Sequence, residues 1–183
     1  MFISTADALL PTIAWPTPIE MSRIYLPLIF TLLLINTREK LFYFIITIAA
    51  SFGLIAVKGG IFAISTGFSY RVLGPEFSHY GGNNEFAIAT LMTIPLVILW
   101  LREATDRRLK LALMGAVPLM FSSAISSHSR GALVTMGVLI PLLLWHSKRK
   151  YLAVPVLIVG IVVAGQVLPE KWFARMETIE TFE

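Results

Sequence analysis

Long apolar stretches alternate with short polar ones along most of this 183-residue chain. Six of the apolar stretches have about 16–18 residues each, which is near the lower end of the roughly 17–25 that a transmembrane helix needs. They are residues 21–36, 41–57, 85–101, 109–125, 131–146 and 151–167. The pattern predicts an all-α fold, a polytopic transmembrane helix bundle with about six spans.

Composition agrees with a membrane protein, because 56% of the residues are hydrophobic and only 14% are charged. A soluble domain of this length could not bury so much apolar surface, so membrane lipid is an expected partner. The net charge of +4 would suggest nucleic acid in a soluble protein. Here the basic residues cluster in short connections between spans, so we expect them to set the topology and expect no nucleic-acid partner.

The basic residues also predict which side of the membrane each connection occupies. If the spans alternate, connections 37–40, 102–110 and 147–150 share one side, and they hold nine of the 15 basic residues but three of the 11 acidic ones. Short connections rich in lysine and arginine are cytoplasmic. Both termini are therefore predicted on the outside, together with the long segment 58–84, which is too polar and glycine-rich to span. We expect that segment to lie along the membrane surface or to fold back over the bundle.

The stretch "SSHSRGALVTM", residues 126–136, carries the first candidate site. Ser129 is the predicted N-cap of the fifth span, and Arg130 lies in its first turn. A cation there opposes the helix dipole and costs stability unless an anion joins it. Arginine beside the first-turn amides, with Gly131 allowing close approach, is suited to phosphate or diphosphate. The alternative is that Arg130 anchors the span at the lipid headgroups.

Other polar residues could extend this site. His128 could be a general base, a diphosphate contact or an ordinary loop residue. In "GGNNEF", Asn83 is a predicted N-cap with Glu85 in the first turn, although Asn84 and Glu85 could also line a polar cavity that holds a sugar. Lys58 and Arg71 would join Arg130 in a cationic cluster if the long segment folds over the bundle. The sequence contains no metal-binding or phosphate-loop motif, so we expect neither a metal nor ATP.

Two stretches resemble a known family. "SHSRGALVTM" resembles the SRGA signature of the O-antigen ligase and polymerase family of bacterial membrane glycosyltransferases. Residues 58–96, with their KGG, YRV-G-P and NNE elements, are similar to the O-glycosylation ligases associated with the exosortase A system. The similarity covers the chain from about residue 40 to 183. On this resemblance, residues 1–40 are an N-terminal periplasmic segment with the first span, and residues 41–183 are part of the ligase membrane domain.

The resemblance implies a multi-pass enzyme of the bacterial inner membrane whose active face is periplasmic. Such enzymes transfer a glycan from undecaprenyl diphosphate to an acceptor protein or lipid, and they use no cofactor. Arg130 matches the signature arginine that engages the diphosphate. The expected substrate-binding residues are Lys58, Arg71, Asn84, Glu85, His128, Ser129, Arg130 and Gly131.

The chain departs from the family pattern at its end. The family carries a large periplasmic loop with a second arginine and a histidine, and this loop would begin near "WFARMETIETFE". We therefore expect the chain to be part of a longer enzyme and to be inactive alone. The alternatives are a polysaccharide polymerase of the same superfamily, a component of a polysaccharide transporter or flippase, and a structural membrane subunit. A transporter predicts charged groups at mid-membrane, whereas the ionisable residues here lie at the ends of the spans.

Overall fold

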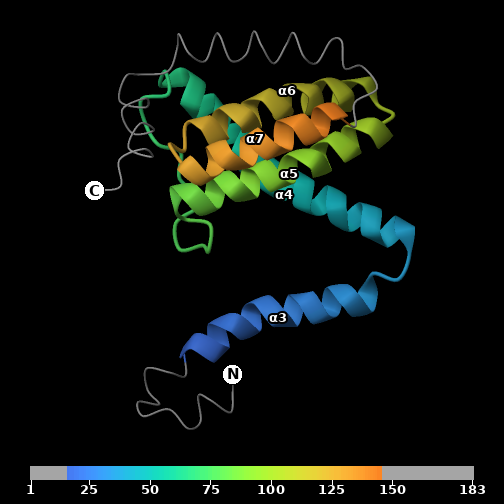
Figure 1. The fold of residues 1–183 in the computed structure, drawn as a ribbon. Coiled ribbons are helices and arrows are strands. Elements are labelled where there is room, and N and C mark those ends of the chain that lie inside the picture. The colour runs from blue at the N-terminus through green and yellow to red at the C-terminus, as the bar shows by residue number, and fades with distance from the viewer. Residues whose placement is uncertain (1–15, 146–183) are drawn as a thin grey trace. The chain divides into compact units, whose positions relative to one another are not determined.

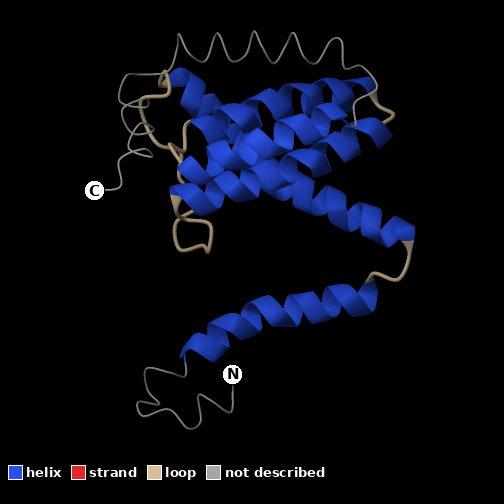
Figure 2. Cartoon of the chain, in the orientation of Figure 1, coloured by secondary structure: helices blue, strands red, loops and turns tan. Residues whose placement is uncertain are grey.

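The structure is a computed structural model that describes residues 16–145, with side chains from residue 21 onward. These residues form helices and connections without a strand, so the all-α prediction is confirmed for them (Figures 1 and 2). The helices are α3 (Pro16–Leu34), α4 (Arg38–Ser65), α5 (Asn83–Glu103), α6 (Arg107–Ile125) and α7 (Arg130–Trp145).

Three of these helices, α4, α5 and α6, are long and apolar enough to cross a membrane. The segment Met21–Leu34 and helix α7 are apolar but shorter. The predicted span at 151–167 lies outside the described residues. The total of six spans and the outside location of both termini therefore stay predictions.

The chain divides into two compact units, residues 1–44 and residues 45–183. The described part of the first unit contains α3 and the start of α4, and apolar side chains such as Leu32 and Leu33 are largely exposed on it. The second unit contains the rest of α4 together with α5, α6 and α7. The candidate site residues within the described range all belong to this second unit.

Helix α4 packs in the second unit through small residues. Its buried side is made of Ala49, Gly53, Ala56, Gly60 and Ala63. These positions are three or four residues apart, so they share one face of the helix and allow its backbone to approach its neighbours closely. A Cβ on Gly60 would collide with the carbonyl group of Leu119 in α6, so the two backbones touch where the helices cross.

Helix α5 supplies the larger side chains of the core. It contacts both α6 and α7, and it also faces α4, where Phe86 packs against Phe52 and a Cβ on Gly53 would touch Val97. Phe86, Leu91, Ile94 and Val97 are all buried. Many outward-facing side chains of the unit are apolar as well, including Leu54, Met92, Leu111, Val134 and Val138. A surface that is apolar on the outside is typical of helices that lie in lipid.

The predicted long connection at 58–84 is partly wrong. Residues 58–65 continue helix α4, and the connection runs only from residue 66 to residue 82. Gly59 and Gly60 make the segment glycine-rich, but they serve close helix packing: a Cβ on Gly59 would press on the Ser123 hydroxyl and the Val72 side chain. The rest of the connection folds back over the bundle end, where the Val72 amide donates to the Ser126 carbonyl at 3.0 Å.

Two connections therefore meet at one end of the second unit, namely 66–82 and the turn 126–129 between α6 and α7. The connection between α5 and α6 lies at the other end of these helices (Figure 1). There the Asp106 side chain caps α6 by accepting from the Arg108 amide at 2.9 Å. Successive connections thus lie at opposite ends of the helices, as the predicted topology requires. Which end faces the cytoplasm stays a prediction.

Candidate functional site

The turn 126–129 is polar but buried. Ser126 and Ser127 have no exposed surface, Ser129 is 5% exposed and His128 is 8% exposed. Buried polar groups are costly unless they are hydrogen-bonded. The partners of these four residues therefore determine how the site is built.

One set of partners comes from the connection 66–82. The Ser126 hydroxyl donates to the Tyr70 carbonyl at 2.8 Å, and the Ser126 carbonyl accepts from the Val72 amide. These two bonds flank Arg71 in the sequence. The backbone that carries Arg71 is therefore fixed against the turn that leads into α7.

His128 makes a third bond to the same connection. Its Nε2 lies 3.1 Å from the Phe68 carbonyl oxygen, and its backbone is left-handed with φ 54°. A carbonyl oxygen only accepts, so Nε2 carries the hydrogen of this bond. The sequence left His128 open as a base, a ligand or a loop residue, and the structure shows it joining two connections.

The start of α5 supplies the second set of partners. The side-chain amide of Asn83 donates through Nδ2 to the Ser127 carbonyl at 3.0 Å. The side-chain oxygen of Asn84, Oδ1, accepts from the Ser129 hydroxyl at 2.5 Å. The prediction that Asn83 caps α5 is wrong, because Gly82 is the N-cap and Asn83 is the first helical residue. Both asparagines bond across to the turn instead of to their own helix end.

Glu85 lies in the first turn of α5, as predicted. Its carboxylate folds back against Gly82, where a Cβ would collide with it. A carboxylate in this position interacts favourably with the positive end of the helix. The favourable interaction with the start of α5 is therefore sufficient to explain a glutamate at position 85. Asn84 lies in the same first turn.

The predicted cap of α7 is confirmed. The Ser129 hydroxyl accepts from the Ala132 amide at 3.2 Å while it donates to Asn84, so one hydroxyl joins the starts of two helices. Arg130 is the first residue of α7 and is exposed. A Cβ on Gly131 would lie 2.7 Å from the Asn84 amide oxygen, so the two helix starts are in direct contact there.

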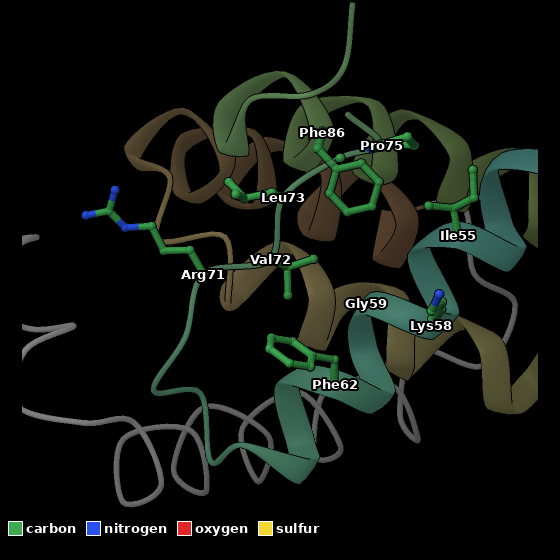
Figure 3. Close-up of a pocket in the computed structure, with 10 residues that line it drawn as sticks. Ile55, Lys58, Gly59, Phe62, Arg71, Val72, Leu73, Pro75 and Phe86 are labelled. Atoms are coloured by element: carbon green, nitrogen blue, oxygen red, sulfur yellow. The ribbon is translucent and has the colours of Figure 1, made fainter. Parts of the chain in front are cut away.

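The turn 126–129, the first residues of α5 and the start of α7 with Arg130 together form what we call the Arg130 cluster. A groove of about 470 Å³ lies next to it. It is lined by Ile55, Lys58, Gly59, Phe62, Arg71, Val72, Leu73, Gly74, Pro75 and Phe86. Lys58 and Arg71 lie on opposite sides of the lining in Figure 3, with the rings of Phe62 and Phe86 and the side chain of Val72 between them. Two of the three residues expected to form a cationic cluster, Lys58 and Arg71, therefore line the same apolar groove. The Arg71 guanidinium extends outward from it.

The groove and the Arg130 cluster are neighbours. Arg71 lines the groove and is held between the two hydrogen bonds to Ser126, and Phe86 lies two residues after Asn84. The predicted site residues therefore gather at one end of the second unit. The sequence did not reveal that Ser126, Ser127 and Asn83 join the connections through hydrogen bonds. The run of serines at positions 126, 127 and 129, beside apolar spans, was the available signal.

No group of His, Asp and Glu side chains suited to a metal ion occurs within residues 16–145. Comparison of the chain with protein families, with curated proteins and with solved structures finds no match.

Proposed function

We propose that this chain is part of a membrane glycosyltransferase of the O-antigen ligase type. It would transfer a glycan from undecaprenyl diphosphate to a protein or lipid acceptor on the periplasmic face of the bacterial inner membrane. The chain would span about six times, with both termini periplasmic. The observation that carries the proposal is the position of Arg130, which is exposed at the start of α7. It follows the turn 126–129, and Ser126 of that turn bonds to the residues on either side of Arg71 in the groove lining.

The diphosphate would bind at Arg130. A guanidinium can bind phosphate oxygens with two parallel hydrogen bonds, and the start of a helix adds the positive end of its dipole. Without an anion, these two positive groups oppose each other. The hydrogen bonds of Ser129 hold the helix start in place, so the anion-binding groups are arranged before the substrate arrives.

The groove suits the part of the donor next to the diphosphate. Its centre is apolar, with Phe62, Val72 and Phe86, which fits an isoprenoid chain. Lys58 and Arg71 at its sides can approach phosphate oxygens. An apolar site with a few charged groups is typical of binding sites for amphiphilic ligands.

In the proposed reaction, a hydroxyl oxygen of the acceptor attacks the anomeric carbon of the glycan. The bond from that carbon to the diphosphate oxygen breaks, and the diphosphate leaves with the bonding electrons. Arg130 would stabilise the charge that develops on this oxygen. The hydroxyl proton would pass to a base, which the family pattern places in its large periplasmic loop.

The buried residues favour an enzyme over a transporter. Within residues 21–145, the buried polar side chains belong to threonine and serine residues and to His128, while lysine, arginine, aspartate and glutamate side chains are not buried. A transporter of charged substrates or coupling ions would need ionisable groups inside the bundle. The hydroxyls that do occur there are neutral.

The test is glycan transfer by the full-length protein with Arg130→Ala. Transfer from undecaprenyl diphosphate should fall by about 100-fold or more, because the leaving group loses its main charge partner. Arg130→Lys should retain part of the activity, since it keeps the charge but loses the two-pronged geometry. The matched control is Arg102→Ala, which removes an exposed arginine from the last turn of α5 and should be nearly fully active. Full activity of Arg130→Ala, with normal membrane insertion, would show that the proposed diphosphate role is wrong.

A further inference from the structure

The turn formed by residues 75–81, at the end of the connection between α4 and α5, presents one aromatic side chain outward. Phe77 is fully exposed and has a left-handed backbone with φ 60°. This conformation is unfavourable for a bulky residue and persists only where the surrounding structure enforces it. An exposed phenylalanine held in this way needs a physical explanation.

Hydrogen bonds close the turn. The Ser78 hydroxyl donates to the Pro75 carbonyl at 2.7 Å and accepts from the Tyr80 amide at 3.2 Å. The Ser78 carbonyl accepts from the Gly81 amide at 3.1 Å. Phe77 thus lies between Pro75 and Tyr80, which both bond to the Ser78 hydroxyl. These bonds fix the backbone of the turn and with it the outward direction of the Phe77 side chain.

The base of the turn is attached to the helices. The ring of Tyr80 packs edge-on against Phe52 of α4, with 5.4 Å between the centroids, and Phe52 packs against Phe86 of α5 at 5.7 Å. A Cβ on Gly74 would collide with the Tyr80 carbonyl, so the two ends of the turn are in contact. The turn is therefore a fixed projection from the bundle.

The surroundings of Phe77 have the composition of a bilayer interface. Leu73 and Tyr80 of the same connection are also exposed, and the polar residues Glu76 and His79 lie within the turn. Tyrosine and tryptophan are enriched where helices leave the hydrocarbon layer, and Tyr80 lies in this turn. The long apolar helix α5 begins here, and Figure 1 shows the green loop projecting beside its start.

We propose that Phe77 inserts into the headgroup region of the lipid bilayer and that the turn 75–81 is a membrane anchor. The bilayer surface is the occupant that the position favours, because the turn leads directly into the long apolar helix α5 and projects beside its start. Leu73, Gly74 and Pro75 also line the groove, so the anchored turn would hold one groove wall at the lipid surface. The anchor does not depend on what the groove binds.

The test uses the absence of cysteine from the chain. A single cysteine is introduced as Phe77→Cys, labelled with an environment-sensitive fluorophore such as nitrobenzoxadiazole, and the full chain is reconstituted in vesicles of phosphatidylethanolamine and phosphatidylglycerol. Quenching is measured with nitroxide-labelled lipids and with aqueous iodide. The matched control is Glu76→Cys, which places the label on the neighbouring exposed residue of the same turn.

The label at position 77 should emit at shorter wavelength and be quenched about twofold more by lipid nitroxide than the label at position 76, which should respond mainly to iodide. Strong iodide quenching at both positions would overturn the proposal, because Phe77 would then face water. Protection of position 77 from both quenchers would also overturn it, because a protein surface, such as a second copy of the chain, would then cover the residue.

Discussion

The amide oxygen of Asn84 accepts a hydrogen bond from the Ser129 hydroxyl, although the two residues are 45 positions apart. The same hydroxyl caps α7 by accepting from Ala132. A single side chain therefore sets both the start of α7 and its distance from α5. Arg130, the next residue, takes its place from this arrangement.

Replacing Ser129 with alanine should destabilise the bundle. The change removes the helix cap, which is worth about 1 kcal/mol, and it leaves the Asn84 amide oxygen without the Ser129 hydroxyl, which costs about 1–3 kcal/mol if that oxygen stays dry. The measurement is the midpoint of unfolding by dodecyl sulfate in mixed micelles. Ser65→Ala is the control, because that exposed hydroxyl bonds only to the carbonyl of its own helix at Phe62. Equal midpoints for the two variants would contradict the linking role of Ser129.

Two glycine-to-alanine changes should have opposite effects. Gly60→Ala forces a methyl group against the Leu119 carbonyl of α6 and should cost about 1–3 kcal/mol, as overpacking does. Gly115 lies within α6 and has open space around its Cβ position, so Gly115→Ala should stabilise by up to about 1 kcal/mol through helix propensity. Both are measured by thermal unfolding in detergent. Stability of Gly60→Ala equal to or above that of the unchanged protein would mean that the α4–α6 contact is looser than the structure shows.

His128 should tolerate glutamine better than leucine. The glutamine amide can reach the position of Nε2 and donate to the Phe68 carbonyl, whereas leucine leaves that carbonyl without this donor. We expect His128→Gln to keep most of the stability and His128→Leu to lose about 1–3 kcal/mol. Transfer assays on the same variants separate this joining role from catalysis. Loss of transfer in a stable His128→Gln protein would identify the ring as a chemical participant.

The proposed topology can be read from single cysteines in this cysteine-free chain. Glu76→Cys lies in the connection before α5, and Thr105→Cys lies in the connection after it. A maleimide that does not cross membranes should label position 76 in cells whose outer membrane has been opened, and it should label position 105 only after the inner membrane is lysed. Labelling of position 105 first would invert the topology and move Arg130 away from the periplasm.

The helices and the cap of α7 could be predicted from the sequence because they depend on local interactions. Apolar runs long enough to span mark α4, α5 and α6, and Ser129 satisfies an amide only three residues away. Arg130 was identified for the same reason, since its conflict with the helix dipole involves its own helix alone.

Only the tertiary structure decided which distant residues meet. Asn83 bonds to Ser127 instead of capping α5, and His128 reaches Phe68 60 positions away. The extension of α4 through Gly60 depends on a close approach to α6 that no local pattern reveals. Likewise, Lys58 and Arg71 share a groove because the connection after α4 folds back over the bundle. The reason is physical: buried hydrogen-bonding groups take partners wherever packing provides them, and packing involves the whole chain.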